Sequence, residues 1–565
     1  MRWIVATEQL DKPVKADEEQ LVTLVNNFYT AALFGRQRWT ANWSLYPNLF
    51  LSEDLWPANY DRTQIDANFI RRIMYHKAGL LFFSKPRVVV HPFGTGATRE
   101  GAEQMQRILD SIELDQGDPR KRINDFLFGG LFGIWNRKVW FDPWDNPPLG
   151  RIRTGSINPV HVYPDPLATS MEDARFIIYA RQVATEEVFK RYGLWVRPED
   201  DISLLSDEAK RILQENEWSV YAAMQYTGQA RVLVKECLWR DPTVIEEEVE
   251  IDGKKFKIRK PKYPYGRMLT VAGGRVVKDG QYNYRRWPHI AKQYYRVPFR
   301  WCGVGEVQNL MSLQLDLVKG IASVSDNRNQ TANTAWMVDS NSGVEPDMIT
   351  NEGGLIIVKT PGSEVVRMSP PSMPGYVTEH NRDNQDRMEL LAGALDFRMA
   401  GKAITHTGGV AFEAQQMAGH TSLRLQLEEI ESSIEEDGDL KIEMIRRHWT
   451  KDQSFFATEG DEIKEFQYDP NLSKDGIYKL RVGHGSTLPV SRARRRDDAL
   501  SLYQAGVIDK EEVLWITETD NREEILERIQ EREQALAEKS EASGISPDKF
   551  ASPSKGKLPG GAIKG

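Results

Sequence analysis

The side chains best suited to chemistry are three carboxylates in the first third of the chain. Asp165 lies between two prolines, and Glu172 and Asp173 follow shortly after it. Divalent cations bind clustered oxygen ligands, so this group is compatible with a metal-dependent nuclease or hydrolase. An aspartate between prolines is also typical of a rigid turn. We favour the turn and expect no metal site here.

The sequence patterns of common catalytic sites are missing. A nucleotide-driven motor needs the phosphate-binding pattern G-x-x-x-x-G-K-[ST], and no stretch of the chain matches it. The chain also lacks the zinc pattern H-E-x-x-H, the pattern C-x-x-C and the hydrolase pattern G-x-S-x-G. We therefore expect a protein that is not an enzyme and needs no cofactor.

Basic residues are densest in one run of four arginines: Arg492, Arg494, Arg495 and Arg496. These side chains suit DNA phosphates, or carboxylates of the same chain or a neighbouring subunit, and we favour the carboxylates. Residues 497–517 resemble a helix-turn-helix with Gly506 at the bend. Residues 510–518 carry three glutamates and one lysine, so we expect the second helix to pack against protein rather than to contact phosphates.

Composition describes a folded, acidic protein of several domains. The 565 residues carry a formal net charge of −8, with 40% hydrophobic and 28% charged residues. A chain of this length exceeds a single hydrophobic core, so we expect about two to four domains. The negative charge opposes tight binding of nucleic acid, but it suits a protein through which DNA slides without sticking.

Neither membrane insertion nor disulfide bonding is expected. No run approaches the roughly 18 apolar residues that a membrane span needs, and the N-terminal residues lack the apolar core of a signal peptide. The two cysteines, Cys237 and Cys302, are far apart and lack metal-ligand spacing, so we expect them to fill apolar space. These features predict a cytoplasmic protein.

Two long amphipathic helices are the elements most able to position a functional surface. Apolar residues repeat at helical spacing over 305–330 and again, in a narrower stripe, over 376–399. At 1.5 Å per residue the first helix would be roughly 40 Å long. A narrow stripe on a long helix usually packs against a similar helix, from the same chain or a neighbouring copy. We expect that seam to contain Leu310, Leu317, Ile321, Met388, Leu391 and Leu395.

The segments around these helices differ in character. Residues 332–375 are rich in β-formers, proline and glycine, which predicts a small β-rich tip. Residues 400–409 predict a glycine-bearing loop. A third helical pattern over 409–450 contains Gly419 and Gly438, which predict kinks or close backbone contacts. The polar side chains of the loop include Lys402, His406 and Thr407.

The remaining sequence predicts mixed α and β structure, so the fold class is α+β. A helix from Ala16 to Phe34 should break at Gly35. Acidic Glu246–Glu250 followed by basic Lys254–Lys262 predicts an exposed hairpin. Strands are expected over 134–141, 156–163, 175–182, 231–240, 462–468 and 477–482, and helices over 185–192, 492–504, 510–517 and 522–539.

This order of parts resembles the portal, or head-to-tail connector, protein of tailed bacteriophages. The sequences Ile157–Pro166, Ala174–Ile177 and Val188–Gly193 are similar to the portal wing. The sequence Tyr503–Asp509 is similar to the C-terminal helical region of portals. The resemblance spans roughly residues 20–540 and rests on architecture more than on a sharp motif, because portals have no catalytic signature.

The resemblance implies a division of the chain and a role for several residues. In the clip, Glu345 and Asp347 would be exposed where motor and adaptor proteins dock. The polar side chains of the tunnel loop would face DNA, and the arginine run would contact DNA or a neighbouring subunit. The implied parts are a wing (1–303), a stem helix (304–331), a clip (332–375), a second stem helix (376–399), a tunnel loop (400–409), a long kinked helix with returning wing strands (410–488), a helical crown (489–540) and a disordered tail (541–565).

The resemblance also implies a function. Roughly twelve subunits would form a ring at one capsid vertex, and a terminase motor would drive double-stranded DNA through it without sequence specificity. Head-completion or tail adaptor proteins, the major capsid protein and scaffolding proteins would be further partners, with no membrane involved. The protein would occupy the host cytoplasm during assembly and the virion afterwards. A metal-dependent hydrolase with a helical insertion and a coiled-coil scaffold are the alternatives, and neither predicts a closed ring.

Overall fold

A computed structural model describes residues 16–53, 63–82, 86, 88–146, 150–198, 230–251, 254–332, 336–345, 359–368, 373–393, 423–450, 453–459, 462–473, 476–483, 499–517, 525–526 and 528–529. The chain divides into two compact units. The first comprises residues 1–453 and 469–488, and the second comprises residues 454–468 and 489–565. Among the described helices, none combines the length and the apolar composition that crossing a lipid bilayer requires.

Two antiparallel sheets form the centre of the first unit. The three-stranded sheet has the order β11 (His289–Gln293), β2 (Ile134–Asp142), β3 (Arg151–Ile157). Of these three strands, β2 agrees with the strand predicted over 134–141. The strand predicted over 156–163 is wrong, because β3 ends at Ile157 and a 3-10 turn at Pro159–His161 precedes the next strand. The five-stranded sheet has the order β10 (Arg275–Gln281), β9 (Arg267–Ala272), β6 (Arg231–Trp239), β5 (Phe176–Ala184), β4 (Val162–Pro164).

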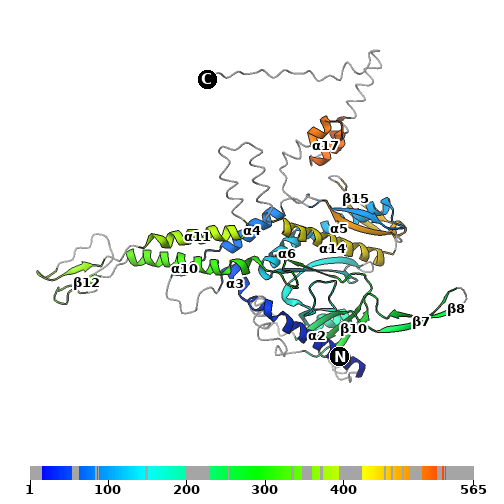
Figure 1. The fold of residues 1–565 in the computed structure, drawn as a ribbon, viewed down its shortest axis with the longest axis horizontal. Helices are drawn as coiled ribbons and strands as arrows, with labels where there is room; N and C mark the ends of the chain where they lie inside the picture. The colour runs from blue at the N-terminus through cyan, green and yellow to red at the C-terminus, as the bar shows by residue number, and fades with distance from the viewer. Residues whose placement is uncertain are drawn as a thin grey trace, which may run out of the picture. The chain divides into compact units, whose positions relative to one another are not determined.

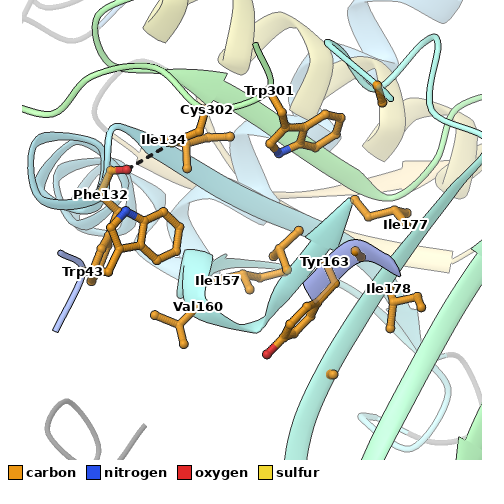
Figure 2. Packing of buried hydrophobic residues seen from close by; sticks show 14 of the residues in the cluster. Trp43, Phe132, Ile134, Ile157, Val160, Tyr163, Ile177, Ile178, Trp301 and Cys302 are labelled. Carbon is orange, nitrogen blue, oxygen red and sulfur yellow. Dashed lines mark hydrogen bonds between the residues drawn. The ribbon is translucent and has the colours of Figure 1, made fainter. Parts of the chain in front are cut away.

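A large hydrophobic core joins these sheets to the surrounding helices. Figure 2 shows Trp43 beside Phe132, with Tyr163, Ile177 and Ile178 from strands of the five-stranded sheet. Both cysteines are buried, as predicted. The thiol of Cys302 donates a hydrogen bond to the carbonyl of Phe132 at 3.3 Å (Figure 2).

The first helix, α2 (Ala16–Thr40), continues through Gly35, so the predicted break there is wrong. A Cβ atom at this position would lie 2.7 Å from Cβ of Pro166, so the glycine permits close packing rather than ending the helix. One residue later, the buried Arg36 donates hydrogen bonds to the carbonyls of Val160 and Val162 at 3.0 and 2.9 Å. This helix is therefore fixed to the start of β4 and to the residues just before it.

Local patterns that combine a clear period with a clear stop are confirmed. The strand predicted over 134–141 is β2, which follows directly after helix α6 (Asp118–Phe132) and Gly133, whose φ is +81°. Helix α7 (Thr185–Tyr192) has the predicted bounds and ends at Gly193, with a φ of +73°. Glycine adopts this left-handed conformation at little cost, which explains both helix ends.

The two predicted long helices are α10 (Glu306–Ala332) and α11 (Gly375–Leu391), which pack against each other (Figure 1). The first half of α10 also contacts α3 (Leu45–Leu51), α4 (Phe69–Leu81) and α6. Beyond α10 the chain forms a short antiparallel pair, in which β12 (Trp336–Val338) faces β13 (Val365–Arg367). Residues 394–422, where the second helix was predicted to end and the third to begin, lie outside the described residues.

The third long helix is α14 (Arg424–His448), and it is continuous through Gly438. A Cβ atom at Gly438 would lie 2.5 Å from Cδ1 of Leu480 in β16 (Ile477–Val482). Of the two predicted roles, close contact is therefore confirmed at this glycine. Strand β16 pairs with β1 (Val88–Phe93), which is followed by α5 (Arg99–Gln116), and not with the other returning strand.

The second unit contains β14 (Gln453–Glu459) paired with β15 (Glu462–Tyr468), and α17 (Lys510–Ile516). Asp509 caps α17, because its Oδ1 accepts a hydrogen bond from the backbone N–H of Glu512 at 2.8 Å. Gly506, with a φ of +70°, separates this helix from the helical residues 499–504. The predicted helix-turn-helix outline is therefore present, with its cap and its glycine bend.

Candidate functional site: the stem and its tip

The stem, defined as α10 and α11, begins at a buried charge cluster. Nζ of Lys77 in α4 lies 2.7 Å from Oε2 of Glu306, and both side chains are almost fully buried. The hydroxyls of Tyr294 and Tyr295 donate hydrogen bonds to the same oxygen at 3.0 and 2.9 Å. Burial lowers the pKa of Lys77, while the Glu306 charge opposes that shift. A carboxylate with three donors fixes the first turn of α10 to α4 and to the chain after β11.

A second polar contact fixes α10 two turns later. The side-chain Oε1 of Gln314 accepts hydrogen bonds from the backbone N–H groups of Phe69 and Ile70 at 3.0 and 3.4 Å. These groups belong to the first turn of α4, where helix N–H groups have no partner within the helix. The Gln314 amide also donates to the carbonyl of Ala67 at 2.5 Å. The buried Gln314 side chain thus supplies the acceptor that these N–H groups of α4 lack within their own helix, and it fixes the position of α10 relative to α4.

Between the two stem helices the seam is partly apolar and partly polar. Oδ2 of Asp316 lies 2.9 Å from Nε2 of His380 and accepts a hydrogen bond from the Asn384 amide at 2.6 Å. The hydrogen bond with His380 is the main cause that lowers the pKa of Asp316, followed by that with Asn384. A Cβ atom at Gly320 would lie 2.0 Å from Oδ1 of Asn381, so the helices cross closely there.

The predicted seam residues divide into three groups. Leu310, Leu317 and Met388 are fully buried, and Ile321 is partly buried. Leu391 is 61% exposed in the single chain, so it does not contribute to the core. Leu395 lies outside the described residues. Sequence reasoning missed the polar part of the seam, although Gly320 beside asparagines on the facing helix was a signal for close contact.

The tip is held to the end of α10 by one arginine. In the β12–β13 pair, Trp336 stands opposite Arg367. The guanidinium of Arg367 lies 5.9 Å from the Trp336 ring centroid and donates to the carbonyl of Ala332 at 3.0 Å. Glu345 is exposed, and Asp347 lies outside the described residues. The tip therefore has its own polar anchor at the last residue of α10.

Large apolar side chains are exposed at the tip and on α11. Their exposed fractions range from 44% to 70% in the single chain. When exposed apolar side chains of this size gather into a patch, the surface is typical of one that another protein covers. The residues are Met337, Val366, Met368, Tyr376, Leu390 and Leu391.

Two of the three carboxylates considered for metal chemistry, those of Asp165 and Asp173, are occupied by hydrogen bonds. The buried carboxylate of Asp165 accepts hydrogen bonds from Nε and Nη2 of Arg175 at 2.6 and 2.8 Å. It also accepts one from the backbone N–H of Leu167 at 3.2 Å. Asp173 accepts from the backbone and hydroxyl groups of Thr169 and Ser170, and these bonds, which outweigh the effect of burial, lower its pKa to about 2. The turn interpretation is therefore the correct one for Asp165. No group of potential metal ligands is found in the part of the chain that the structure describes.

Two other predicted sites fall outside the described residues. They are the tunnel-loop side chains Lys402, His406 and Thr407 and the arginine run Arg492, Arg494, Arg495 and Arg496.

Comparison with known protein families gives a match over most of the chain. A family model described as phage P22-like portal protein matches residues 79–548, which include the stem, the tip and α14. A search of curated proteins finds no match.

Proposed function

The chain belongs to the phage P22-like portal protein family, and on that premise we propose that it forms a closed ring at one vertex of the capsid. A terminase motor drives double-stranded DNA through this ring during packaging. Tail or adaptor proteins attach to it later, and the DNA leaves by the same channel. The subunit in this proposal is a structural component of the virion and not an enzyme.

The stem is the observation that carries the proposal. Its first turns are fixed in the core by Glu306 and Gln314, whereas the later turns of α10 and much of α11 are exposed. A helix pair that is fixed in a core and leaves apolar side chains exposed on its outer surface suits subunits that stand side by side. In a ring, the exposed face of Leu390 and Leu391 would be covered by the next copy.

The proposal assigns the remaining parts of the chain as follows. Residues 1–303, with the strands after α14, form the wing, and residues 332–375 form the clip, where Glu345 and Asp347 meet the motor and the adaptor. Residues 400–409 form the tunnel loop, whose Lys402 faces DNA phosphates. Residues 489–540 form the crown. Asp165 supports this function over a hydrolase, because Arg175 and backbone N–H groups occupy its oxygens.

A pair of substitutions in the stem tests the proposal. Leu317→Asp places a charge in the fully buried seam and should destabilise the subunit by several kcal/mol. Leu391→Asp changes a residue that is 61% exposed, so the subunit should fold normally and fail to form rings. Folding is measured by circular dichroism, and ring formation by light scattering and negative-stain images. A parent protein that stays monomeric or dimeric would refute the ring, and normal rings from Leu391→Asp would show that this face lies outside the interface.

A further inference from the structure

The hairpin of β7 (Val244–Ile251) and β8 (Lys254–Pro261) forms a two-stranded sheet of its own. In Figure 1 it stands away from the five-stranded sheet of the same unit. Residues 242–248 and 257–262 are all exposed. An isolated two-stranded hairpin is marginally stable in water, so this element gains stability if another strand is added to it.

The base of the hairpin is rigidly anchored. Asp241 has a buried side chain, and its Oδ1 accepts a hydrogen bond from the N–H of Thr243 at 2.9 Å. Its Oδ2 accepts from Arg267 at 3.2 Å, and Arg267 also holds Asp279 at 2.7 Å. The backbone N–H of Lys262 donates to the carbonyl of Thr243 at 2.8 Å, closing the base. The hairpin is thus exposed at residues 242–248 and 257–262 and firmly held where it leaves the sheet.

The two strands carry opposite charges. β7 contains the carboxylates of Glu246, Glu247, Glu248 and Glu250, and β8 contains the cations of Lys254, Lys255, Lys257, Arg259 and Lys260. In the register, Glu246 faces Arg259 and Glu248 faces Lys257. Arg259 Nε lies 3.1 Å from Glu246 Oε1, with both side chains more than half exposed. Exposed pairs of this kind contribute about 0–1 kcal/mol each, so the charges do little to hold the hairpin together.

The segregation of charge between the two strands affects contacts between molecules more than it affects the stability of one hairpin. Each strand has one edge with no strand partner among the described residues. Charged edge strands normally prevent such edges from pairing with other chains. Here, two copies that brought β7 against β7 would place carboxylates opposite carboxylates, which is destabilising. Two copies that brought β7 against β8 would place carboxylates opposite cations. The pattern thus opposes two-fold pairing and favours head-to-tail pairing, the type of contact that closes into rings.

We propose that β7 of one subunit pairs edge to edge with β8 of the next, so that the hairpins of neighbouring subunits form a shared β-structure. The partner is a second copy of this chain, because each hairpin presents both the acidic and the basic edge. The inference rests on the proposed ring and adds to it an interface outside the stem and the tip. Backbone hydrogen bonds supply the contact, as in other cases of strand addition, and the charges fix its direction.

Charge-reversal variants separate this contact from the ion pairs within one hairpin. The first variant, Glu246→Lys with Glu247→Lys and Glu248→Lys, makes both strands basic. The second, Lys257→Glu with Arg259→Glu and Lys260→Glu, makes both strands acidic. Within each chain the charges now repel, and mixing the chains cannot change that. Between chains, a basic hairpin can pair with an acidic one, so an equimolar mixture should recover the contact that each variant alone has lost.

The readout is carbodiimide crosslinking, which joins carboxylates to amines in contact, on rings assembled from equal amounts of ¹⁴N- and ¹⁵N-labelled chains. We expect mixed-isotope crosslinks between β7 and β8 peptides in the parent. They should fall at least tenfold in each variant alone and return when the two variants are combined. Parent rings with only same-isotope crosslinks, or no recovery on mixing, would overturn the strand addition and leave the proposed function standing. A parent that forms no ring at all would overturn both.

Discussion

Glu306 illustrates how a single side chain can hold a long element in place. Its Oε2 is shared by Lys77, Tyr294 and Tyr295, which come from α4 and from the chain after β11. The sequence contains no sign of this cluster, because a glutamate in the first turn of a helix usually faces solvent and interacts with the helix dipole. Its lysine partner is 229 positions away. Such pairing over long sequence distances is set by the tertiary fold and escapes local reasoning.

Removing one charge of the Lys77–Glu306 pair should lower the free energy of unfolding more than removing both charges. Lys77→Met leaves the Glu306 carboxylate buried without its cation, and we expect a loss of about 3–5 kcal/mol in the free energy of unfolding. Adding Glu306→Gln to Lys77→Met removes the uncompensated charge and should recover part of that loss, since the Gln oxygen can still accept from the tyrosines. Urea unfolding followed by circular dichroism measures both. A single variant within 1 kcal/mol of the parent would contradict the role assigned to the pair.

Asp110 in α5 should make the subunit less stable as the pH rises. Burial raises its pKa to about 6, with a hydrogen bond from Gln106 acting in the opposite direction. Because the folded-state pKa lies above the unfolded value, the contribution to stability is present below about pH 4 and is lost as the pH rises through 6.

Asp110→Asn keeps the shape and removes this titration. It should stabilise the protein by about 1–2 kcal/mol at pH 7, after allowance for solvent screening, and have little effect at pH 4. Unfolding curves at the two pH values measure the difference. An equal effect at both would mean that the Asp110 charge is not the cause.

At the scale of elements, the sequence predicts where helices and strands lie along the chain better than it predicts which of them pair or pack together. The bounds of α7, β15 and β16 agree with the patterns from which they were predicted, because each has a clear period and clear end signals. The pairing of β16 with β1 was not predictable, because nearly four hundred positions separate the strands. Gly35 was wrongly taken as a helix end, since only the fold shows that Pro166 needs the space.

The candidate site was predictable to a similar degree. The apolar stripe correctly placed Leu310, Leu317 and Met388 at buried positions. The periodicity could not distinguish them from Leu391, because Leu391 lies between the buried Met388 and Ala392, and only the fold shows which side of this turn faces the core. The Asp316–His380 contact was not predictable either, because both side chains are on the polar faces of their helices.

Two helical glycines should respond oppositely to the same substitution. In Gly438→Ala, the added methyl group meets Leu480 in β16 at 2.5 Å, and we expect a loss of about 1–3 kcal/mol from overpacking. Gly79→Ala in α4 is the matched control, because no atom lies within 4 Å of the added Cβ. Its better helix propensity should stabilise by up to about 1 kcal/mol. Thermal unfolding measures both, and a stabilising Gly438→Ala would show that α14 and β16 are not in close contact.

At the scale of the whole molecule, the proposed ring makes a prediction about DNA. If the tunnel loop lines the channel, a ring of Lys402 side chains meets the phosphates and helps to retain packaged DNA. Lys402→Glu combined with His406→Ala should leave ring assembly intact and increase DNA loss from filled capsids, most strongly at low salt, where charge repulsion is least screened. The control is Lys402→Gln, which removes the cation without adding an anion and should have a smaller effect. Equal DNA retention by all three proteins at every salt concentration would place the loop away from DNA.

The way in which α10 is held has a mechanical consequence. The 27-residue helix is held in the core near Glu306 and Gln314, and further along it is supported by α11 and by Thr63, whose backbone N–H donates to Oδ1 of Asp326 at 2.9 Å. For a rod of roughly 40 Å, a rotation of about 5° at the Glu306 end displaces the other end by about 3.5 Å. The stiffness of the buried hydrogen bonds at Glu306 and Gln314, together with the support from Thr63 and α11, therefore sets how accurately the tip is held.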